Sequence, residues 1–443
     1  MADKPAKSYS YRQIVNAWCM YDWANSAFAT TIMAVVLPTF FSSVAGSTLP
    51  SKVVATSYWG YATSISMVLV GLTAPILGAL ADHSGKKKLL LSRFAALGIV
   101  ATALLVFVST GDWLLAAILY ILGHVGFSGS LIFCDSLLPH VAKPDEVDQV
   151  STKGYALGYA GGGILLAVNL LWIMKPGWFG ISSTEMASRL SFLSVAIWWA
   201  VFSIPLFKRV PEPPAVLEKG ESQNLLRGAF QRLGHTFREI RKYKELLKFL
   251  VGFWLYNDGI GTIITMAAIY GAELEIGQTH LIGTILLVQF VGVPFAYLFG
   301  ALAKKLGAKR SILIALGVYV FVSVFGFFVT KALHFWILGF VVGTVQGGSQ
   351  ALSRSLYSSM TPKAKTAEFF GFYDVSSKFA GIIGPTLFAL VGQAAGSSRY
   401  AILALVPLFV IGGILLLSVK VQDGVAVARA EDAEMGVQVS PTA

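Results

Sequence analysis

The chain has 443 residues, a formal net charge of +11 and a mean hydropathy of +0.69; 55% of its residues are apolar and 13% are charged. So few polar side chains cannot cover this much apolar surface in water, which excludes a set of soluble domains and predicts an integral membrane protein. Because Lys and Arg concentrate in the loops on one side of the apolar stretches, we expect them to face a lipid bilayer, with no nucleic acid as partner.

Apolar stretches of about 20 residues recur between short polar loops, and each is long enough to cross a hydrocarbon core about 30 Å thick as a helix. We count twelve, which predicts an all-α membrane protein of two six-helix halves. The excess of Lys and Arg on one side places both termini in the cytoplasm. The expected organisation is a cytoplasmic N-terminus (1–11), an N-terminal half (12–207), a cytoplasmic linker with an amphipathic helix (208–245), a C-terminal half (246–419) and a disordered cytoplasmic tail (420–443).

The first span contains a carboxylate, Asp22, between Tyr21 and a nearby amide, Asn25. At 1.5 Å per residue Asp22 lies about 15 Å from the cytoplasmic end, and Asn25 is on the same face one turn later. A charge at that depth costs roughly 2.5–3.5 kcal/mol by insertion scales, so it faces a polar cavity or has a partner. We favour a cation or proton site on a translocation path; the alternative is a buried pair in which the two side chains satisfy each other.

The turn after the second span runs from Gly78 to Lys88 and reads Gly-Ala-Leu-Ala-Asp-His-Ser-Gly-Lys-Lys-Lys. It resembles the Gly-x-Leu-Ala-Asp-Arg-x-Gly-Arg-Lys loop of the major facilitator superfamily, which implies that its Asp meets the cytoplasmic end of the eleventh helix and helps to hold an outward-open state. Physically, the second Gly permits a tight turn, the Asp can cap a facing helix, and the lysines can anchor at the lipid surface. We expect a conformational latch of Gly78, Asp82, Gly85, Lys86 and Lys87; the alternative is a coincidental lysine-rich loop.

The second half repeats these features, as transporters built from parallel halves do. The seventh span carries Asn257 and Asp258, with the acid about 18 Å from the cytoplasmic end. The segment 300–310 repeats the latch sequence, but Lys304 stands where the acid would be. A second latch therefore cannot use the same charge pairing.

The tenth and eleventh spans add the polar residues Gln346, Gln350, Arg354, Tyr373, Asp374 and Lys378. An intrahelical ion pair between Asp374 and Lys378 is the alternative to a role in a cavity, and snorkelling to the interface is the alternative for Arg354. In the fourth span, His124 is either a proton relay or a helix-packing histidine, and Asp135 is expected to pair with a cation at the cytoplasmic mouth.

In the linker, apolar residues recur at helical spacing while basic residues take the other faces. The apolar set is Leu226, Phe230, Leu233, Phe237 and Ile240, and the basic set is Arg227, Arg232, Arg238, Arg241 and Lys242. This pattern predicts an amphipathic helix that lies in the inner leaflet, with a regulatory or partner-binding role as the alternative.

Four motifs together resemble one subfamily of the superfamily. They are Tyr-Asp-Trp-Ala-Asn-Ser-Ala-Phe at 21–28, Gly-Tyr-Ala-Leu-Gly-Tyr at 154–159, Tyr-Asn-Asp-Gly at 256–259, and Gln-Ala-Leu-Ser-Arg-Ser at 350–355 followed by Glu-Phe-Phe-Gly at 368–371. Over residues 12–419 the chain is similar to the vacuole-effluxer family, which includes the autophagy-related vacuolar amino-acid exporter of fungi. Because the sequence lacks fungal-type extensions and an Asn-x-Ser/Thr sequon, it looks more like a bacterial member in the cytoplasmic (inner) membrane.

The resemblance implies a secondary transporter that works by alternating access on a small-molecule substrate, with amino acids as the class. A zwitterion needs both an anionic and a cationic partner, so Asp22 and Asp258 could face its ammonium, and Arg354 or Lys378 its carboxylate. Either acid is a candidate for proton coupling. We expect a monomer without cofactor, metal site or enzymatic activity, because no His-Glu-x-x-His, paired Cys ligands or phosphate loop is present in the sequence. The alternatives are an exporter of organic anions or drugs, and a non-transporting membrane sensor on the same scaffold.

Overall fold

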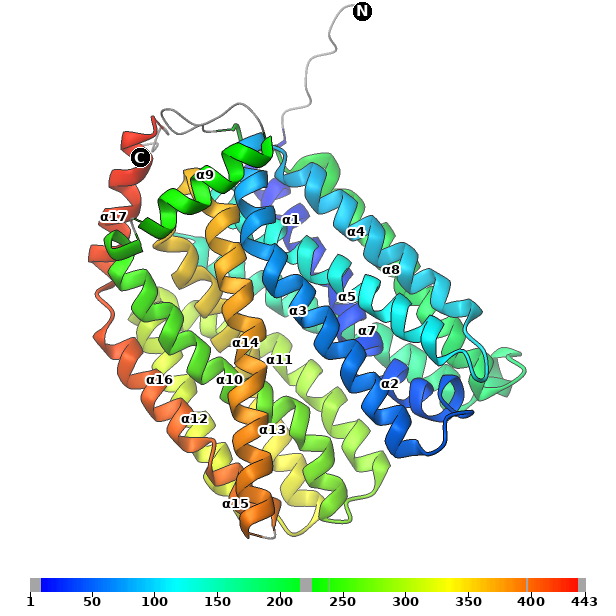
Figure 1. The fold of residues 1–443 in the computed structure, drawn as a ribbon. Helices are drawn as coiled ribbons and strands as arrows, with labels where there is room; N and C mark the ends of the chain where they lie inside the picture. Colours follow the sequence, from blue (N-terminus) through cyan, green and yellow to red (C-terminus); the bar gives the residue numbers. More distant parts are fainter. Residues whose placement is uncertain (1–8, 216–224, 239, 396, 437–443) are drawn as a thin grey trace, which may run out of the picture.

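The structure is a computed structural model that describes residues 9–215, 225–238, 240–395 and 397–436. Long helices run side by side through one bundle, and shorter helices lie at its ends (Figure 1). The first half consists of α1 (Tyr11–Ala27), η1 (Phe28–Val35), α2 (Val36–Phe40), η2 (Phe41–Ala45), α3 (Lys52–Ser84), α4 (Lys87–Leu104), η3 (Leu105–Phe107), α5 (Trp113–Ser136), α6 (Leu138–Val141), α7 (Val147–Met174), η4 (Pro176–Phe179) and α8 (Thr184–Arg209).

The linker contributes a helix as the sequence predicts. The linker and second half consist of α9 (Leu225–Arg238), η5 (Ile240–Tyr243), α10 (Lys244–Glu273), α11 (Gln278–Leu306), α12 (Ala308–Phe327), α13 (Ala332–Ser359), η6 (Lys363–Lys365), α14 (Thr366–Ala395), α15 (Ser398–Leu403), α16 (Val406–Ser418) and α17 (Val421–Glu434). The side chains of Leu226, Arg227, Arg232, Phe237 and Ile240 lie outside the described part of the chain, as does that of Lys378.

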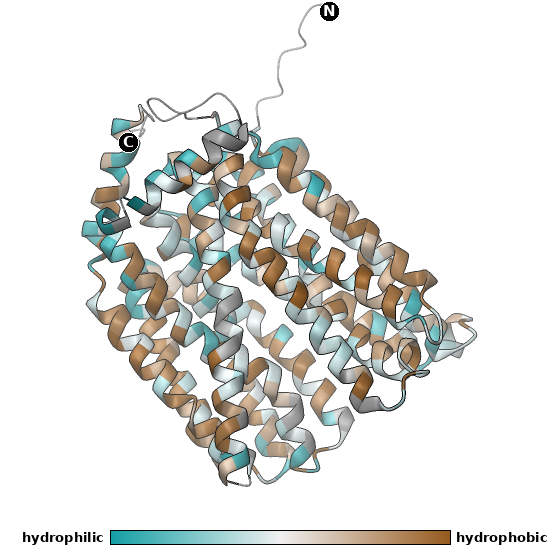
Figure 2. Cartoon of the chain, in the orientation of Figure 1, coloured by the Kyte–Doolittle hydropathy of each residue, from teal (hydrophilic) through white to brown (hydrophobic). Residues whose placement is uncertain are grey.

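Helices suit this chain because a backbone that crosses lipid must satisfy its hydrogen bonds within the segment. Among the described residues, nine helical segments are long and apolar enough to cross a membrane. Three more helices, α10, α13 and α14, have 28 to 30 residues and run beside them (Figure 1). Hydrophobic residues cover the long helices, and hydrophilic ones gather toward the ends (Figure 2).

Side-chain caps and glycines set several of the helix ends. Ser10 caps α1 in a capping box with Gln13, and Ser183 caps α8. Gly85 ends α3 in the left-handed conformation, at φ 60°, which a residue with a Cβ rarely adopts. That turn sends the chain directly back into α4.

Both α9 and α17 lie at the same end of the bundle, which we call the inner end (Figure 1). The prediction of a disordered tail from residue 420 is wrong for residues 421–434, because they form α17 and two of its acids are buried. Glu431 forms ion pairs with Lys242 and Lys365, and the carboxylate of Asp432 accepts a hydrogen bond from the backbone N–H of Ala364 at 3.1 Å. The partners lie far away in the sequence, so local composition gave no sign of this helix.

The two halves meet closely where glycines replace side chains. A Cβ on Gly78 of α3 would lie 2.1 Å from the carbonyl oxygen of Ala367 on α14. On the opposite seam, a Cβ on Gly300 of α11 would lie 2.4 Å from the Thr152 hydroxyl on α7. Small residues at helix crossings allow such backbone approach in membranes.

Candidate functional site

A cavity of about 300 Å³ lies between the halves, where α1, α5 and α7 face α11 and α13. Its wall is mixed, with charged, amide and phenol groups beside apolar ones. The lining residues are Asp22, Asn25, Ser26, Ala29, Thr30, Phe127, Leu131, Asp135, Tyr155, Gly158, Tyr159, Gln289, Gln346, Gln350 and Arg354. A concave site with a few convergent polar groups is the usual form of a small-molecule site.

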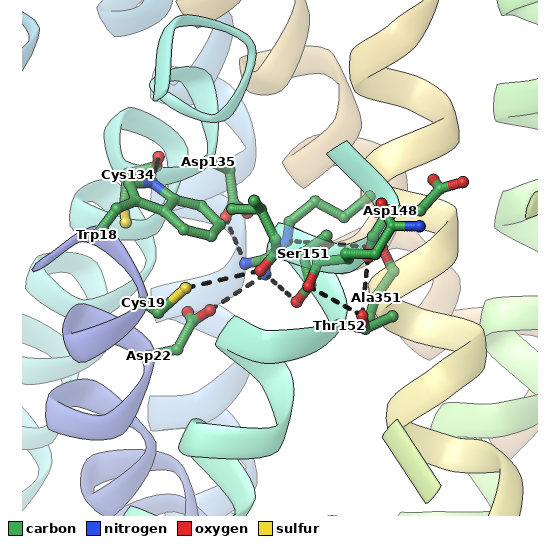
Figure 3. A network of polar contacts seen from close by, with 12 residues as sticks. Trp18, Cys19, Asp22, Cys134, Asp135, Asp148, Ser151, Thr152 and Ala351 are labelled. Atoms are coloured by element: carbon green, nitrogen blue, oxygen red, sulfur yellow. Dashed lines mark hydrogen bonds and ion pairs between the residues drawn. The ribbon is translucent and has the colours of Figure 1, made fainter. Parts of the chain in front are cut away.

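Arg354 of α13 holds the inner wall of this cavity together. Its Nη1 donates to Asp135 Oδ1 at 2.9 Å, and its Nη2 donates to Asp22 Oδ2 at 3.1 Å. Its Nε donates to the Ser151 hydroxyl at 2.9 Å, and Nη2 also donates to the Ser151 carbonyl at 3.0 Å. The three partners come from α5, α1 and α7, all in the other half. Asp135, Asp22 and Ser151 are labelled in the polar network drawn in Figure 3. The guanidinium therefore joins the two halves.

Aromatic rings fix the plane of the guanidinium. Its carbon lies 4.9 Å from the ring centre of Trp18 and 4.5 Å from that of Tyr155, both within cation–π range. Trp18 is itself held, because its indole N–H donates to the Cys134 carbonyl at 2.8 Å. The side chain of Arg354 is 2% exposed, so the snorkelling alternative is wrong: paired acids make burial possible for this cation.

Further hydrogen bonds between the halves lie beside Arg354. The Ser151 hydroxyl donates to the Ala351 carbonyl at 2.7 Å, and the Ser355 hydroxyl donates to the Asp148 carboxylate at 2.5 Å. Together with the arginine they close the cavity toward the inner end. The structure therefore represents a state in which the inner side is shut.

The turn after α3 makes a second closure at the same end. Asp82 Oδ2 accepts a hydrogen bond from the backbone N–H of Glu368, in the first turn of α14, at 2.8 Å. Its Oδ1 lies 2.8 Å from the Lys87 ammonium, and both side chains are buried. Lys87 also donates to the Thr366 hydroxyl at 2.5 Å. A carboxylate at a helix N-terminus satisfies free N–H groups and the positive end of the helix dipole.

The lysines of this turn do not act together as lipid anchors, which corrects that expectation. Lys87 is buried against Asp82, and Lys88 turns back to donate to the Phe207 and Val210 carbonyls at the end of α8. Lys86 is the one of the three that is exposed. Two of the three ammonium groups are therefore bound by protein groups and not by lipid: Lys87 by the Asp82 carboxylate, and Lys88 by carbonyls at the end of α8.

The structure brings five of the predicted site residues to the cavity wall: Asp22, Asn25, Gln346, Gln350 and Arg354. The other described ones lie elsewhere. Tyr21 is fully buried in the core, Asn257 donates to the Ser377 hydroxyl at 3.5 Å, and Tyr373 stacks on Phe253. Asp374, beside Tyr373 on α14, does not line this cavity either, and the side chain of its predicted partner Lys378 lies outside the described part.

Asp258 stands apart from the cavity in a different role. The helix α14 departs from helical geometry at Gly381, where φ is −85° and ψ is 16°. Directly after this kink, the backbone N–H of Gly384 donates to Asp258 Oδ2 at 2.8 Å. Asp258 of α10 thus caps the outer part of the broken helix, since a kink leaves N–H groups without intrahelical acceptors.

Ten of the lining residues were absent from the predicted site, and Asp135, Tyr155, Tyr159 and Gln289 are among them. Asp135 pairs with a cation at the inner side of the cavity, as the sequence led us to expect, but it also forms part of the wall. The two tyrosines are four residues apart on one face of α7. The glycines beside them indicate close helix packing, and this pattern hid the signal for a cavity wall. Gln289 is a single amide in an apolar run, a weak signal that could have been followed.

A second hollow, about 340 Å³, adjoins the first and is mostly apolar. The two share Gln289 and Gln346, and the second is lined further along the chain of the first span, by Met33 and Ala34 of η1. It therefore lies farther from the inner end than Asp22. A polar chamber and an apolar chamber meet at these glutamines.

His124 belongs to neither hollow. Its Nδ1 lies 2.7 Å from the Ser66 hydroxyl, and its ring stacks on Tyr120 with centres 5.8 Å apart. It is fully buried. This environment favours the helix-packing interpretation over the proton relay.

The fold matches that of major facilitator transporters. The proton:xylose symporter XylE, bound to 6-bromo-6-deoxy-D-glucose, aligns with a TM-score of 0.71 and 15% identity over 92% of this chain and 95% of that one. The human organic anion transporter MFSD10 aligns with a TM-score of 0.65 and 15% identity over 92% of this chain and all of that one. The predicted major facilitator fold is confirmed.

The chain belongs to the vacuole effluxer Atg22-like family, whose sequence model matches residues 10–429. The uncharacterized MFS-type transporter YxiO of Bacillus subtilis is 37% identical over 94% of this chain and 97% of its own length. Autophagy-related protein 22 of Yarrowia lipolytica is 24% identical over 82% of this chain and 75% of its own. The resemblance read from the four motifs is confirmed, and neither these relatives nor the two structural neighbours are named as enzymes.

Proposed function

We propose that the protein is a secondary transporter that moves amino acids or related zwitterions across the inner membrane by alternating access, with both termini in the cytoplasm and proton coupling through Asp22. The observation that supports this proposal is the cavity between the halves, where Asp22, Asp135 and Arg354 line a space that a small solute could occupy. Rocking of one half against the other exposes such a site to each side in turn.

The pairing of a polar and an apolar hollow supports this substrate class. An amino acid presents an ammonium and a carboxylate at one end and a side chain at the other. The charged chamber suits the first end, and the chamber lined by Met33, Ile263 and Val342 suits an apolar side chain. Asn25, Gln346 and Gln350 add neutral hydrogen-bonding groups between them.

Proton coupling through Asp22 follows from its contact with Arg354. A protonated carboxyl loses its attraction for a guanidinium, so loading Asp22 with a proton loosens the bond that closes the inner side. Asp258, which we also predicted as a coupling group, faces the α14 kink instead of this network. We therefore assign the coupling role to Asp22.

The test is uptake of radiolabelled leucine by the purified protein in liposomes with an imposed pH gradient. We expect the gradient to accelerate uptake, and Asp22→Asn to abolish that acceleration while leucine binding, measured by thermal stabilisation, remains. Asp258→Asn serves as the matched control and should retain the response to the gradient. If both variants respond as the unaltered protein does, proton coupling through Asp22 is excluded; if no amino acid in a panel is taken up or stabilises the protein, the substrate class is wrong.

A further inference from the structure

We infer that the cavity takes up one net positive charge with each substrate molecule, so that a zwitterion crosses with one proton whereas a cationic amine such as lysine crosses without one. This deepens the proposed function and rests on it. The charged residues among those that line the cavity are two acids and one base, Asp22, Asp135 and Arg354. Their formal sum is one negative charge.

The geometry leaves this excess charge open to the cavity. Each acid uses one oxygen on the arginine, Oδ2 of Asp22 and Oδ1 of Asp135. Within the described part of the chain, no donor reaches Asp22 Oδ1 or Asp135 Oδ2. The side chains of Asp22 and Asp135 are 10% and 16% exposed, and both belong to the cavity wall. Two carboxylate oxygens thus face the space where a solute would bind.

Arg354 has little capacity left for a charged ligand in this state. Four of its five N–H groups donate to Asp135, Asp22 and Ser151, and its faces are covered by aromatic rings. The group that remains available for a charged ligand is therefore the acid pair, which attracts an ammonium. An anionic substrate would bring the chamber to two negative charges, so the site disfavours organic anions.

The neighbouring ionisable groups do not cancel the excess. Lys153 of α7 donates to the Asn16 amide oxygen at 2.5 Å and is not part of the wall. Cys19, Cys134, Tyr155 and Tyr373 are neutral in their ordinary state at neutral pH. Lys378, one turn after Asp374, has its side chain outside the described residues.

The charge count then fixes the stoichiometry. An uncompensated carboxylate in a low-dielectric chamber is unfavourable, and the occluded complex is most stable when its charges sum to zero. A zwitterion adds no net charge, so one proton from the aqueous phase must bind an acid of the pair and leave with the substrate on the other side. A monocation supplies the missing charge itself, and no proton is needed.

The test compares leucine and lysine in liposomes that contain the purified full chain and an internal pH dye. With a negative potential inside and no pH gradient, we expect both to be taken up as one positive charge per molecule, and only leucine uptake to acidify the interior. Lysine uptake that acidifies the interior as much as leucine uptake would overturn the stoichiometry and leave the amino-acid transporter standing. Uptake of neither would remove the proposed function and this inference together.

Charge-removing variants provide an independent check. Asp135→Asn and Asp22→Asn each make the triad neutral, so we expect each to lower the lysine-to-leucine uptake ratio by about tenfold and to uncouple leucine from protons. Each retains one acid as a partner for Arg354, which keeps the fold. Glu185→Gln, the same change on the exposed end of α8, is the matched control and should leave the ratio unchanged. An unaltered ratio in both triad variants would contradict the inference.

Discussion

The two halves carry related loop sequences at the inner end, 78–88 and 300–310, but use them differently. In the first half, Asp82 turns inward to the first turn of α14 and is neutralised by Lys87. In the second half, Lys304 is exposed, and Lys309 donates to the Leu417 and Val419 carbonyls at the end of α16. The first loop makes a contact between the halves and the second a contact within one half, although both keep the glycine that allows close approach of the two halves, Gly78 and Gly300. This internal repeat has therefore preserved the close backbone approach but not the charge pairing.

The C-terminal helix supplies acids that the second loop lacks. Glu431 and Asp432 of α17 hold Lys365 and the Ala364 N–H, directly before the start of α14. Asp82 holds the same helix start from the other side. The beginning of α14 is therefore held by two acids of α17 and by one acid of the first loop, two segments that are far apart in the sequence.

The largest effect is expected from Asp82→Ala, which breaks the first loop's contact. It leaves the Lys87 ammonium buried without its acid and the Glu368 N–H without its acceptor, at a cost of about 3–5 kcal/mol. Thermal unfolding of the detergent-purified protein measures this, and Lys304→Ala is the control, with a change within about 0.5 kcal/mol because that side chain is exposed. Equal shifts in the two variants would mean that the two loops are not used differently.

A smaller loss of stability is expected at the two places where glycines bring the halves together. These are compared with the variants Gly78→Ala, at the α3–α14 contact, and Gly300→Ala, at the α11–α7 contact. At Gly78 the new Cβ meets the Ala367 backbone, which cannot move without shifting α14, so we expect a loss of about 2–3 kcal/mol. At Gly300 it meets the Thr152 side chain, which can rotate, so the loss should be about 1 kcal/mol. Gly317→Ala, with open space around it, is the control in the same unfolding measurement. A greater loss at Gly300 would reverse the comparison.

The smallest effect concerns α17 and depends on pH. Burial alone would raise the pKa of Glu431, but hydrogen bonds and charge from Lys242 and Lys365 outweigh it and lower the pKa to about 2, from an ordinary value of 4.5. A lowered folded pKa means that the contact contributes fully above pH 4.5 and is lost as pH falls toward 2. Burial raises the pKa of Asp432. Its effect on stability therefore has the opposite pH dependence, since ionisation of Asp432 at higher pH disfavours the folded state.

We thus expect amide hydrogen exchange of residues 421–434 to quicken as the pH falls below 4.5, after correction for intrinsic rates. Glu431→Gln should quicken it at neutral pH by about 1–2 kcal/mol in local opening free energy and remove this pH response. Glu434→Gln, an exposed neighbour that also contacts Lys242, is the control. Protection that is indifferent to both pH and Glu431→Gln would show that α17 is held by its apolar contacts alone.

The sequence was sufficient for the fold because span length and apolar composition decide which segments cross a membrane. It also located Asp22, Arg354 and the glutamines of α13, since polar residues are costly in an apolar run and so mark an interior surface. It could not reveal that Asp258 caps α14, because the kink at Gly381 is a tertiary feature without a local signal at the acid. For the same reason it missed α17, whose small polar composition indicates a helix only once Lys365 and Lys242 are seen beside it.

The attachment of three helices to one side chain has a consequence for how the inner side opens. Asp22 on α1, Asp135 on α5 and Ser151 on α7 are all bonded to the single guanidinium of Arg354. Withdrawal of that one group breaks all of these bonds together, and α7 then remains tied to α13 only by the Ser151–Ala351 and Ser355–Asp148 hydrogen bonds among the described contacts of the site. One movement of α13 at this point therefore releases contacts to α1, α5 and α7 together, so the inner wall of the cavity loses several of its links in a single step.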